Sequence, residues 1–414
     1  MLTLPVMLLQ NHCGKTNCRC SEQPQRFSRH DLGHRIANRP VRAGLGPSDP
    51  MKITRIEPIL VRTPMLLDDA VPHAGGAPKT DVHTVLVKVE TDDGITGWGE
   101  AFSNAGWQST MTAIAQLIAP RALGKDPTNI AQIQADLHRG LYNTGRSGPT
   151  VYAISGLDIA LWDIAAKRAG MPLYKLLGGS SRTTLPAYAS LLRYGAADVV
   201  ERKTREAIER GYRFIKLHEN RIDIIRAAKR ACGSDVPLMV DCSCPWTVDE
   251  AIAAARKLAD QELAWLEEPI YPPDDHSGLA RLRAVAPMPI AAGENCSNLM
   301  EFKRLMEIGA IGIAQPSVTK VGGVTEMRKV FALGEAHGVV VVPHSPYFGP
   351  GLMASIHVCA AAAREIPIER YYCDFAETPF GDQINPNNGE FALPQGPGLG
   401  QDPDEALVAR MRVG

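Results

Sequence analysis

Short apolar runs alternate with helical patterns over the second half of the chain, beginning near Leu185. Apolar runs without strict alternation are typical of buried parallel strands, and the segments between them are rich in Ala, Arg, Glu and Leu. We predict eight strands, at residues 186–190, 213–217, 238–240, 264–266, 289–292, 311–314, 339–342 and 371–373. Regular alternation of strand and helix indicates an α/β fold, and eight strands are enough to close a barrel.

Residues 51–184 have a different pattern, which indicates an α+β domain. Strands are predicted at residues 53–61, 82–91 and 95–100, with a hairpin turn at Asp92-Asp93-Gly94. Apolar residues at helical spacing predict a helix over 153–168. We interpret Asp158 and Asp163 on this helix as structural groups at the domain junction rather than catalytic ones. The polar segment 68–79 is expected to be a loop that can close over a ligand.

The chain is therefore divided into an N-terminal α+β domain (51–184), a barrel (185–375) and a C-terminal segment (376–414) that packs back on the N-terminal domain. Residues 1–50 show almost no hydrophobic periodicity after the first nine positions, so we expect a disordered leader. Alternatively, the start codon is assigned too early and Met51, which a strand pattern follows at once, is the natural beginning.

The composition is that of a globular protein of two or three domains, with 414 residues, 45% hydrophobic residues and a formal net charge of −1. The balanced charge offers no basic stripe for nucleic acid, so we expect no nucleic-acid partner. No segment approaches the roughly 18 unbroken apolar residues of a membrane span, so we expect no membrane partner. The cysteines after Met51 lack the spacing of a disulfide framework, which favours a reducing cytoplasm.

Three acidic residues each end an apolar run in the predicted barrel. Asp241, Glu267 and Glu294 lie 26 and 27 positions apart, about the length of one strand, one helix and two loops. Consecutive βα units would bring the three carboxylates to one rim of the barrel, where barrel active sites are built. Oxygen ligands of this kind favour Mg²⁺. The alternative, that each acid caps the following helix, does not explain why all three recur at one period.

Basic residues follow two other predicted strands. Lys216 and His218 end the second strand two positions apart, so both side chains point to the same side of it. They are candidates for removing a proton from a substrate, and the sequence leaves open which of them is the base. His344 ends the seventh strand and places an imidazole on the opposite side of the barrel mouth.

From Met51 to about Gly400 the sequence resembles the mandelate racemase and muconate-lactonizing branch of the enolase superfamily. The resemblance rests on motifs that occur in the expected order and cover most of the chain. These are Gly97-Trp98-Gly99-Glu100, Asp158-Ile159-Ala160-Leu161-Trp162-Asp163, Trp265-Leu266-Glu267-Glu268-Pro269, Ala292-Gly293-Glu294, Lys320-Val321-Gly322-Gly323-Val324-Thr325 and Val342-Pro343-His344.

The resemblance implies an α+β capping domain over a (β/α)₇β barrel, a modified TIM barrel. It implies that Asp241, Glu267 and Glu294 bind Mg²⁺, which holds the substrate carboxylate and stabilises the enediolate left when a base removes the α-proton. Glu268, the position after one ligand, is not itself a ligand in this pattern.

Three positions depart from the pattern of the family. His218 stands where relatives similar to mandelate racemase carry a second lysine, which acts as a base. Ser317 stands where those relatives carry an aspartate paired with the histidine of strand seven, so His344 should be a weaker base here. Asp374 falls where many relatives have a glutamate on strand eight, and we expect it to bind the enolate oxygen, although its side chain is shorter.

These features predict a dehydratase that acts on a small hydroxycarboxylate, expected to be a sugar acid. Lys216 or His218 removes the α-proton, and His344 then expels the 3-hydroxyl as water to give a 2-keto-3-deoxy acid. Epimerisation or racemisation is the alternative, but it needs two competent bases and the missing partner of His344 counts against it. Lactone cycloisomerisation is a further alternative. A homologue that binds metal without catalysis is less consistent with a complete set of ligands and bases.

The expected substrate contacts are His73 from the polar loop together with Ser190, Ser317 and Tyr347 near the barrel mouth. The partner is a small carboxylate, and the chain is expected to form a homo-oligomer, because large barrels often expose apolar helix faces that subunits bury. Which acid is the substrate does not follow from the sequence.

Overall fold

The computed structural model describes residues 51–413. The predicted leader, residues 1–50, lies outside the described residues. The alternative of a natural start at Met51 concerns the same residues and stays a prediction. Within the described part of the chain, no helix is both long enough and apolar enough to cross a membrane.

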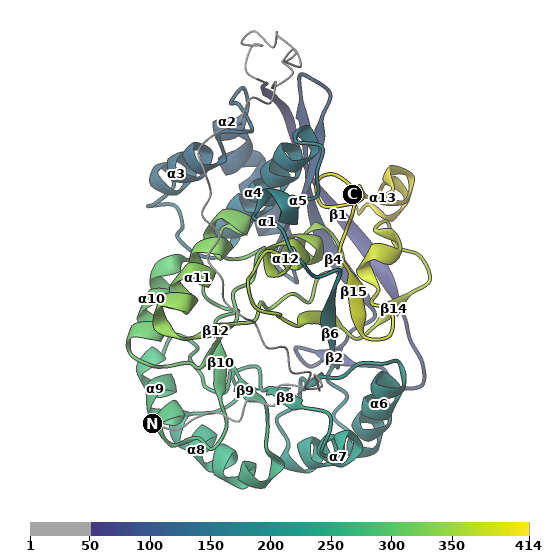
Figure 1. The fold of residues 1–414 in the computed structure, drawn as a ribbon, viewed down its shortest axis with the longest axis vertical. Helices are drawn as coiled ribbons and strands as arrows, with labels where there is room; N and C mark the ends of the chain where they lie inside the picture. The colour runs from purple at the N-terminus through teal and green to yellow at the C-terminus, as the bar shows by residue number, and fades with distance from the viewer. Residues whose placement is uncertain (1–50, 414) are drawn as a thin grey trace, which may run out of the picture. The chain divides into compact units, whose positions relative to one another are not determined.

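The capping domain is built on a long antiparallel hairpin (Figure 1). Its sheet has the order β14-β1-β4-β5, formed by β1 (Ile53–Leu66), β4 (Asp81–Thr91), β5 (Thr96–Ala101) and β14 (Asp374–Phe375). The predicted turn at Asp92-Asp93-Gly94 joins β4 to β5, whose residues pair in antiparallel register. The loop from β1 to β4 carries a small hairpin of β2 (His73–Ala74) and β3 (Ala77–Pro78).

Helices of the capping domain pack on this sheet, and two glycines allow the closest approach. The elements are α1 (Trp107–Ala113), the π-helical turn η1 (Ile114–Ile118), α2 (Ala119–Ala122), α3 (Ile130–Gly140), α4 (Pro149–Arg168) and α5 (Leu173–Leu176). A Cβ atom on Gly99 would lie 1.9 Å from the carbonyl oxygen of Gly156, and one on Gly97 would lie 2.3 Å from that of Ala160. Helix α4 can therefore lie against β5 only because these positions have no side chain.

The barrel consists of eight parallel strands in the order β12-β11-β10-β9-β8-β7-β6-β13. The strands are β6 (Thr184–Ser190), β7 (Ile215–Leu217), β8 (Leu238–Asp241), β9 (Trp265–Glu267), β10 (Ile290–Ala292), β11 (Ile313–Ala314), β12 (Val340–Val341) and β13 (Ile368–Tyr371). The helices between them are α6 (Ala197–Glu209), α7 (Ile222–Cys232), α8 (Val248–Lys257), α9 (His276–Val285), α10 (Leu299–Glu307), α11 (Gly323–His337) and α12 (Pro350–Ala360), with the turn η2 (Ala259–Gln261) after α8. The expected (β/α)₇β fold with a capping domain is confirmed.

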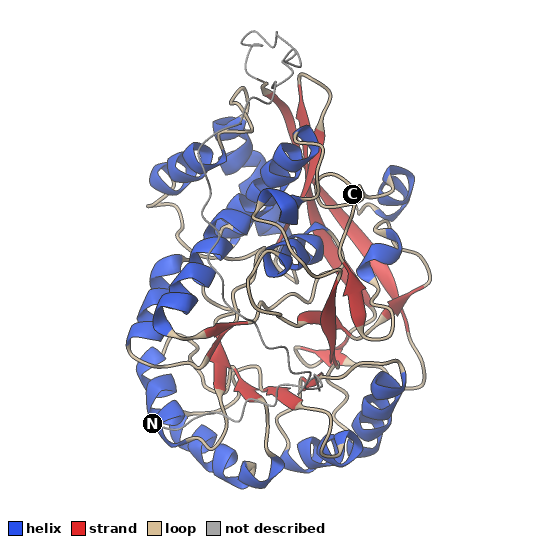
Figure 2. Ribbon diagram, viewed as in Figure 1, coloured by secondary structure: helices blue, strands red, loops and turns tan. Residues whose placement is uncertain are grey.

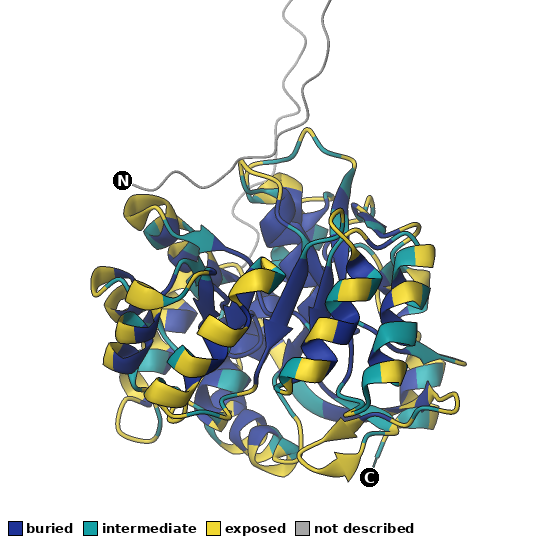
Figure 3. Ribbon diagram, turned by 90° about the horizontal axis from the view of Figure 1, so that it is seen from below, coloured by how far each residue is buried: buried dark blue, intermediate teal, exposed yellow. Residues whose placement is uncertain are grey.

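Burial explains why the barrel strands are so apolar. Figure 2 shows the helices of the barrel on the outside of its strands, and Figure 3 shows buried strands among helices that expose one face. Every residue of β8, β9 and β10 is buried. Strands covered on both faces need apolar side chains at successive positions, which is the pattern that predicted them.

The C-terminal segment contacts both the barrel and the capping domain. Its elements are the turn η3 (Gly381–Ile384), β15 (Glu390–Ala392) and α13 (Glu405–Met411). Strand β15 pairs with β6 of the barrel in antiparallel register. The backbone N–H of Val413 donates to the carbonyl of Leu60 on β1 at 2.9 Å. The domain boundaries at 184/185 and 375/376 stay predictions, since the segment after 375 joins both parts.

Two buried aspartates of α4 connect the capping domain to the rest of the molecule. Asp158 accepts hydrogen bonds from the backbone N–H of Thr325 on α11 at 3.0 Å and from its hydroxyl at 2.6 Å. Asp163 accepts from the backbone N–H groups of Trp98 at 2.9 Å and Leu399 at 2.8 Å. The interpretation of both aspartates as structural groups at the domain junction is confirmed.

The eighth barrel strand differs from its prediction. It was predicted at 371–373, whereas β13 covers Ile368–Tyr371, three residues earlier. Its sequence, Ile-Glu-Arg-Tyr, contains the charged residues Glu369 and Arg370, which are both buried. The apolar run at 371–373 looked more like a buried strand than the true one did. This shift changes which acidic residue reaches the barrel interior.

Candidate active site

Three carboxylates meet at the C-terminal ends of adjacent barrel strands. Asp241 ends β8 and Glu267 ends β9, and the two residues are direct partners in the parallel register. Glu294 follows β10 by two residues. One oxygen atom of each carboxylate lies within 4.8 Å of the other two. We call these three residues the acidic triad.

The acidic triad fits a hard divalent cation. Burial raises the pKa of Glu267, and the neighbouring charge of Asp241 raises it further, although Lys216 opposes both. Three carboxylates so close together repel one another, and a cation among them would remove that repulsion. The side chain of Glu294 is 22% exposed, which leaves the group open on the cavity side. Oxygen ligands with an open side match the preference of Mg²⁺, which usually keeps positions for water or substrate.

Lys216 lies beneath the acidic triad and is wholly buried. Its ammonium is 2.9 Å from Glu267, 2.8 Å from Glu369 and 4.0 Å from Asp241. Burial by itself would lower the pKa of Lys216, but Glu267 and Glu369 hold it well above its ordinary value. Lys216 therefore carries a positive charge and is not among the residues that line the active-site cavity.

Glu369 is a buried acid at the centre of the barrel that the sequence reasoning missed. It lies on β13, and its oxygens accept hydrogen bonds from the hydroxyl of Ser190 at 2.7 Å and the backbone N–H of Ser345 at 2.8 Å. Although burial opposes ionisation, Lys216 keeps the pKa of Glu369 well below its usual range. The available signal was an acidic residue in the short segment Ile368–Tyr371, but the strand was predicted at 371–373, which leaves Glu369 outside it.

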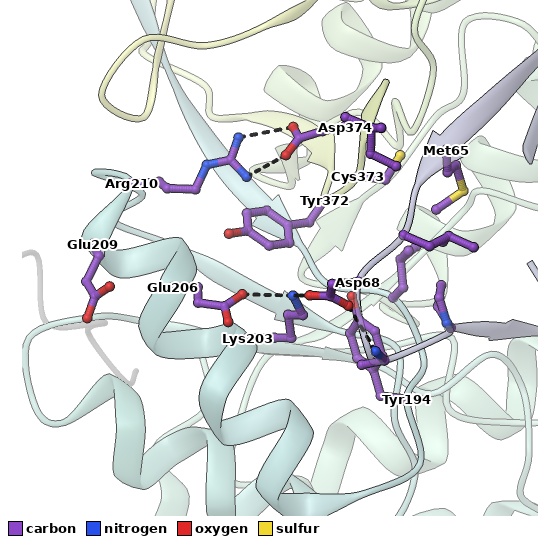
Figure 4. Close-up of a pocket in the computed structure, with 15 residues that line it drawn as sticks. Met65, Asp68, Tyr194, Lys203, Glu206, Glu209, Arg210, Tyr372, Cys373 and Asp374 are labelled. Carbon is purple, nitrogen blue, oxygen red and sulfur yellow. Dashed lines mark hydrogen bonds and ion pairs between the residues drawn. The ribbon is translucent and has the colours of Figure 1, made fainter. Parts of the chain in front are cut away.

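Asp374, the acid expected at the end of strand eight, does not reach this group. It lies on β14 at the edge of the capping sheet, where Arg210 donates to its two oxygens at 3.0 and 3.1 Å. Figure 4 shows this pair beside a separate cavity of about 490 Å³, where Lys203 also contacts Asp68. The expected role of Asp374 at the enolate oxygen is therefore corrected, and Glu369 occupies the interior of the eighth strand instead.

His218 faces the cavity from the Asp241 side of the acidic triad. Its Nδ1 lies 2.7 Å from the carbonyl oxygen of Leu191, and its Nε2 lies 3.3 Å from Asp241. A carbonyl oxygen can only accept, so Nδ1 carries a hydrogen. Nε2 also carries one while it donates to Asp241, and Nε2 holds the lone pair when the ring is neutral. Burial lowers the pKa of His218, but Asp241 raises it by more.

His344 faces the cavity from the Glu294 side. Its Nε2 lies 3.0 Å from Glu294, and burial, which lowers the pKa of His344, is outweighed by that carboxylate. A carboxylate accepts only, so Nε2 carries a hydrogen. Nδ1 lies 3.1 Å from the hydroxyl of Ser317, which also contacts the hydroxyl of Tyr347. The proton on His344 therefore lies on the nitrogen that faces the cavity.

The four predicted substrate contacts have different surroundings. Tyr347 lines the active-site cavity. Ser190 and Ser317 are buried behind it, where they hold Glu369 and His344 respectively. The side chain of His73 is exposed and is not among those lining the cavity, while its backbone N–H donates to the carbonyl of Arg193 at 2.9 Å. The structure thus brings only Tyr347 of these four to the cavity surface.

The cavity itself has a volume of about 460 Å³ and lies between the barrel mouth and the capping domain. Asp241 and Glu294 line it from the barrel. Lys79, His83 and Glu100 line it from the capping domain. A cavity of this size can hold a small acid with one end at the acidic triad and the other against the capping domain.

Comparisons with known proteins agree with this geometry. A barrel with an acidic triad at its strand ends beneath an α+β capping domain is the architecture of the enolase superfamily. The family described as mandelate racemase / muconate lactonizing enzyme, N-terminal domain, matches residues 70–178, and the family described as enolase C-terminal domain-like matches residues 198–407. The chain belongs to the mandelate racemase and muconate lactonizing enzyme family of that superfamily, and it is an enzyme.

Similar proteins of known name are dehydratases and cycloisomerases. The chain is 33% identical over 348 residues to D-galactarolactone cycloisomerase of Agrobacterium fabrum, covering 80% of this chain and 91% of that one. It is 34% identical over 351 residues to D-galactonate dehydratase of Ralstonia nicotianae, covering 78% and 90%. The crystal structure of L-talarate dehydratase from Polaromonas sp. JS666, complexed with Mg and L-glucarate, superposes with a TM-score of 0.77 and 30% identity, covering 88% of this chain and 98% of that one.

Proposed function

We propose that the enzyme removes the α-proton of a sugar acid and then eliminates the 3-hydroxyl as water, giving a 2-keto-3-deoxy acid. The observation that carries the proposal is the placement of two histidines on opposite flanks of the acidic triad. His218 lies beside Asp241, and His344 lies beside Glu294. When neutral, the His218 ring has its lone pair on Nε2, because Nδ1 is held by the carbonyl of Leu191, while His344 has a proton on Nε2. Elimination of water needs one base and one acid.

We assign the base to His218 rather than Lys216. The lone pair of the neutral His218 ring lies on Nε2, because Leu191 holds the hydrogen on Nδ1. Lys216 is buried, charged and bound to two carboxylates, so it has no free lone pair to accept a proton. Its charge lies close to the acidic triad, where it favours negative charge developing on the substrate.

His344 acts as the acid in this proposal. The hydrogen on Nε2 is available to a departing hydroxyl in the cavity, and Ser317 orients the ring through Nδ1. The proton removed from the α-carbon goes to His218, the carbon–oxygen bond at C3 breaks, and the hydroxyl leaves as water with the proton of His344. The resulting enol takes a solvent proton at C3 as it becomes the keto acid.

The cofactor in this proposal is Mg²⁺ held by Asp241, Glu267 and Glu294. When bound, it would neutralise the substrate carboxylate, stabilise the charge left by the α-proton and offset the charge of Asp241 beside His218. Buried Glu268 supports the ligands from behind, since it accepts a hydrogen bond from the backbone N–H of Gly293 at 2.9 Å, next to Glu294.

Cycloisomerisation of a lactone is the second candidate, because a relative with that name is 33% identical to this chain. It begins with the same proton abstraction by His218. It differs in the leaving group: the bond from carbon to the lactone ring oxygen breaks in place of the bond to a hydroxyl. The oxygen stays in the product as part of the carboxylate that ring opening forms.

The test is a screen of purified protein with Mg²⁺ against aldonic, aldaric and other hydroxy acids, with 2-keto acid detected as the semicarbazone. We expect at least one acid to give a signal that disappears with Glu267→Gln and with His218→Asn. A surface control, Glu307→Gln, removes an acid that pairs with Lys303 on α10 and should keep the signal. If the acids give no keto acid and sugar lactones are opened or isomerised instead, the dehydratase assignment is wrong.

A further inference from the structure

The ammonium of Lys79 reaches the active-site cavity from the capping domain. Lys79 lies just before β4, and its backbone N–H donates to the carbonyl of Pro72 at 2.8 Å, which closes the base of the loop that carries β2 and β3. Its Nζ lies 5.9 Å from the ring centroid of Tyr371, and both residues line the cavity. The side chain therefore extends over the mouth of the barrel.

Lys79 has no counter-charge in the described part of the chain. No hydrogen bond or ion pair within residues 51–413 involves its ammonium, whereas Lys203 and Lys216 each contact carboxylates. Asp81, which raises the pKa of Lys79, is already bound by Arg62 at 2.6 Å. Burial has the larger effect and lowers the pKa of Lys79. A cation withdrawn from water without a partner is an unfavourable arrangement that a bound anion would relieve.

Within residues 51–413, Lys79 forms no ion pair with the acidic triad, whose partners are Lys216, His218 and His344. The Tyr371 ring is near both Lys79 and His218, with its centroid 5.9 Å from Nζ of Lys79 and 6.1 Å from the centroid of the imidazole. His218 in turn contacts Asp241. The groups that perturb the pKa of Lys79 are Cys373 and Asp81, and neither belongs to the acidic triad. The cavity therefore has a site for one carboxylate at the triad and a separate positive charge at the capping domain.

We propose that Lys79 binds a second carboxylate of the substrate, so that the enzyme prefers sugar diacids over the monoacids of the same configuration. A monoacid would present a neutral hydroxyl to Lys79 and leave the ammonium uncompensated. The inference rests on the proposed function, because the first carboxylate is placed at the acidic triad. It assigns Lys79 to substrate recognition and not to the proton transfers.

The experiment compares pairs of acids that differ only at C6, namely galactarate with D-galactonate and D-glucarate with D-gluconate. Both kcat/KM and the dissociation constant, by calorimetry, are measured with Mg²⁺ for wild type, Lys79→Met, Lys79→Arg and the control Lys52→Met. Lys52 is exposed and is not among the residues lining the cavity. We expect Lys79→Met to lower the diacid-to-monoacid ratio about 10- to 100-fold, as for loss of a charged hydrogen bond. Lys79→Arg should keep part of the preference for the diacid, and Lys52→Met should leave the diacid-to-monoacid ratio unchanged.

The two proposals fail in different ways. If wild type shows no preference for the diacid in either pair, or if Lys79→Met weakens both members of a pair equally, the second carboxylate site is wrong while dehydration can stand. If no acid is turned over but diacids bind more tightly than monoacids and Lys79→Met removes the difference, the carboxylate site stands and the proposed reaction is wrong.

Discussion

The hydroxyl of Ser317 lies 3.1 Å from Nδ1 of His344, at the position where the sequence resemblance implies a carboxylate. Glu294 accepts from Nε2 on the other side of the ring and outweighs the effect of burial on the pKa of His344, which is raised. In the charged ring that acts as the acid, Nδ1 donates to the hydroxyl of Ser317. Tyr347 contacts Ser317 through its own hydroxyl. A neutral hydroxyl pair thus orients His344 where an anion would stabilise its cation. This arrangement suits a group that gives up a proton better than one that takes it.

The first prediction concerns this pair of hydroxyls. Ser317→Ala should lower kcat about 10- to 100-fold with little change in KM, because the imidazole loses the group that orients its ring through Nδ1. Tyr347→Phe removes only the second hydroxyl and should have a smaller effect in the same direction. Steady-state kinetics and melting temperatures of both variants check this. A rise in KM with unchanged kcat would show that Ser317 contacts substrate instead.

The two histidines should be separable by isotope exchange. His218→Asn should abolish exchange of the substrate α-proton with D₂O and lower turnover by about 10²- to 10⁴-fold, as expected for loss of a general base. His344→Asn should block keto acid formation but keep α-proton exchange, since His218 can still remove the proton, exchange it with the solvent and return a deuteron to the α-carbon. NMR of the recovered substrate measures both. Exchange that survives in His218→Asn would move the base to another residue.

Metal should stabilise the folded protein through the acidic triad. At a Mg²⁺ concentration about 100 times the dissociation constant, binding to the native state alone adds about 2.7 kcal/mol to the free energy of unfolding. We expect a rise in the melting temperature of wild type and of Glu307→Gln, and little or none in Glu267→Gln. Chelation should reverse the rise and abolish activity. Equal stabilisation of all three proteins would place the metal elsewhere.

Glu100 predicts a pH dependence of stability. Glu100 lies on β5 and is buried against the first turn of α12, where its carboxylate accepts a hydrogen bond from the backbone N–H of Gly351 at 2.9 Å. Burial raises the pKa of Glu100 from 4.5 to about 7. The native state therefore binds the proton of Glu100 more tightly than the unfolded state does. The contribution of this protonated group to the free energy of unfolding is complete below pH 4.5 and is lost as the pH rises toward 7.

The matched variant is Glu100→Gln, which cannot ionise. Between pH 4.5 and 7 the free energy of unfolding of wild type should fall relative to the variant by an amount on the order of 3 kcal/mol, at about 1.4 kcal/mol per pKa unit. Denaturation midpoints of both proteins at several pH values measure this. A difference that does not change with pH would mean that Glu100 ionises normally in the folded protein.

The barrel and the acidic triad were predictable because each depends on a local pattern. Asp241 and Glu267 each close an apolar run, and parallel strands bring consecutive runs to one rim whatever the details of packing. The same reasoning placed Lys216 and His218 on one side of their strand. The resemblance to a family added the order of the motifs.

Glu369 was missed because its strand breaks the local rule. A strand that reads Ile-Glu-Arg-Tyr is a poor candidate for the interior unless its charges are satisfied by partners distant in sequence. Here Lys216 and Ser190 supply them, from β7 and β6. The more apolar residues 371–373 predict a strand more strongly, and a strand there would give Asp374 a role that the structure gives it no place for.

The contacts around Lys79 and Ser317 depend on tertiary packing that no local pattern encodes. Lys79 meets Tyr371 only because the capping domain lies over the barrel mouth. The resemblance implied that Ser317 stands at the position paired with His344, but its burial behind the cavity, away from the expected contact with substrate, follows only from packing. The contacts of Lys79 and of Ser317 both depend on the direction of their side chains in the folded protein.

The central claim is that a base beside the acidic triad removes an α-proton and that water then leaves from C3. The most direct test is to run the reaction in D₂O with Mg²⁺ and an acid found by the screen, and to examine the product by NMR. We expect a 2-keto-3-deoxy acid that carries one solvent deuterium at C3 and that is absent with His218→Asn. Recovery of an epimer with deuterium at the α-carbon and no keto acid would contradict it.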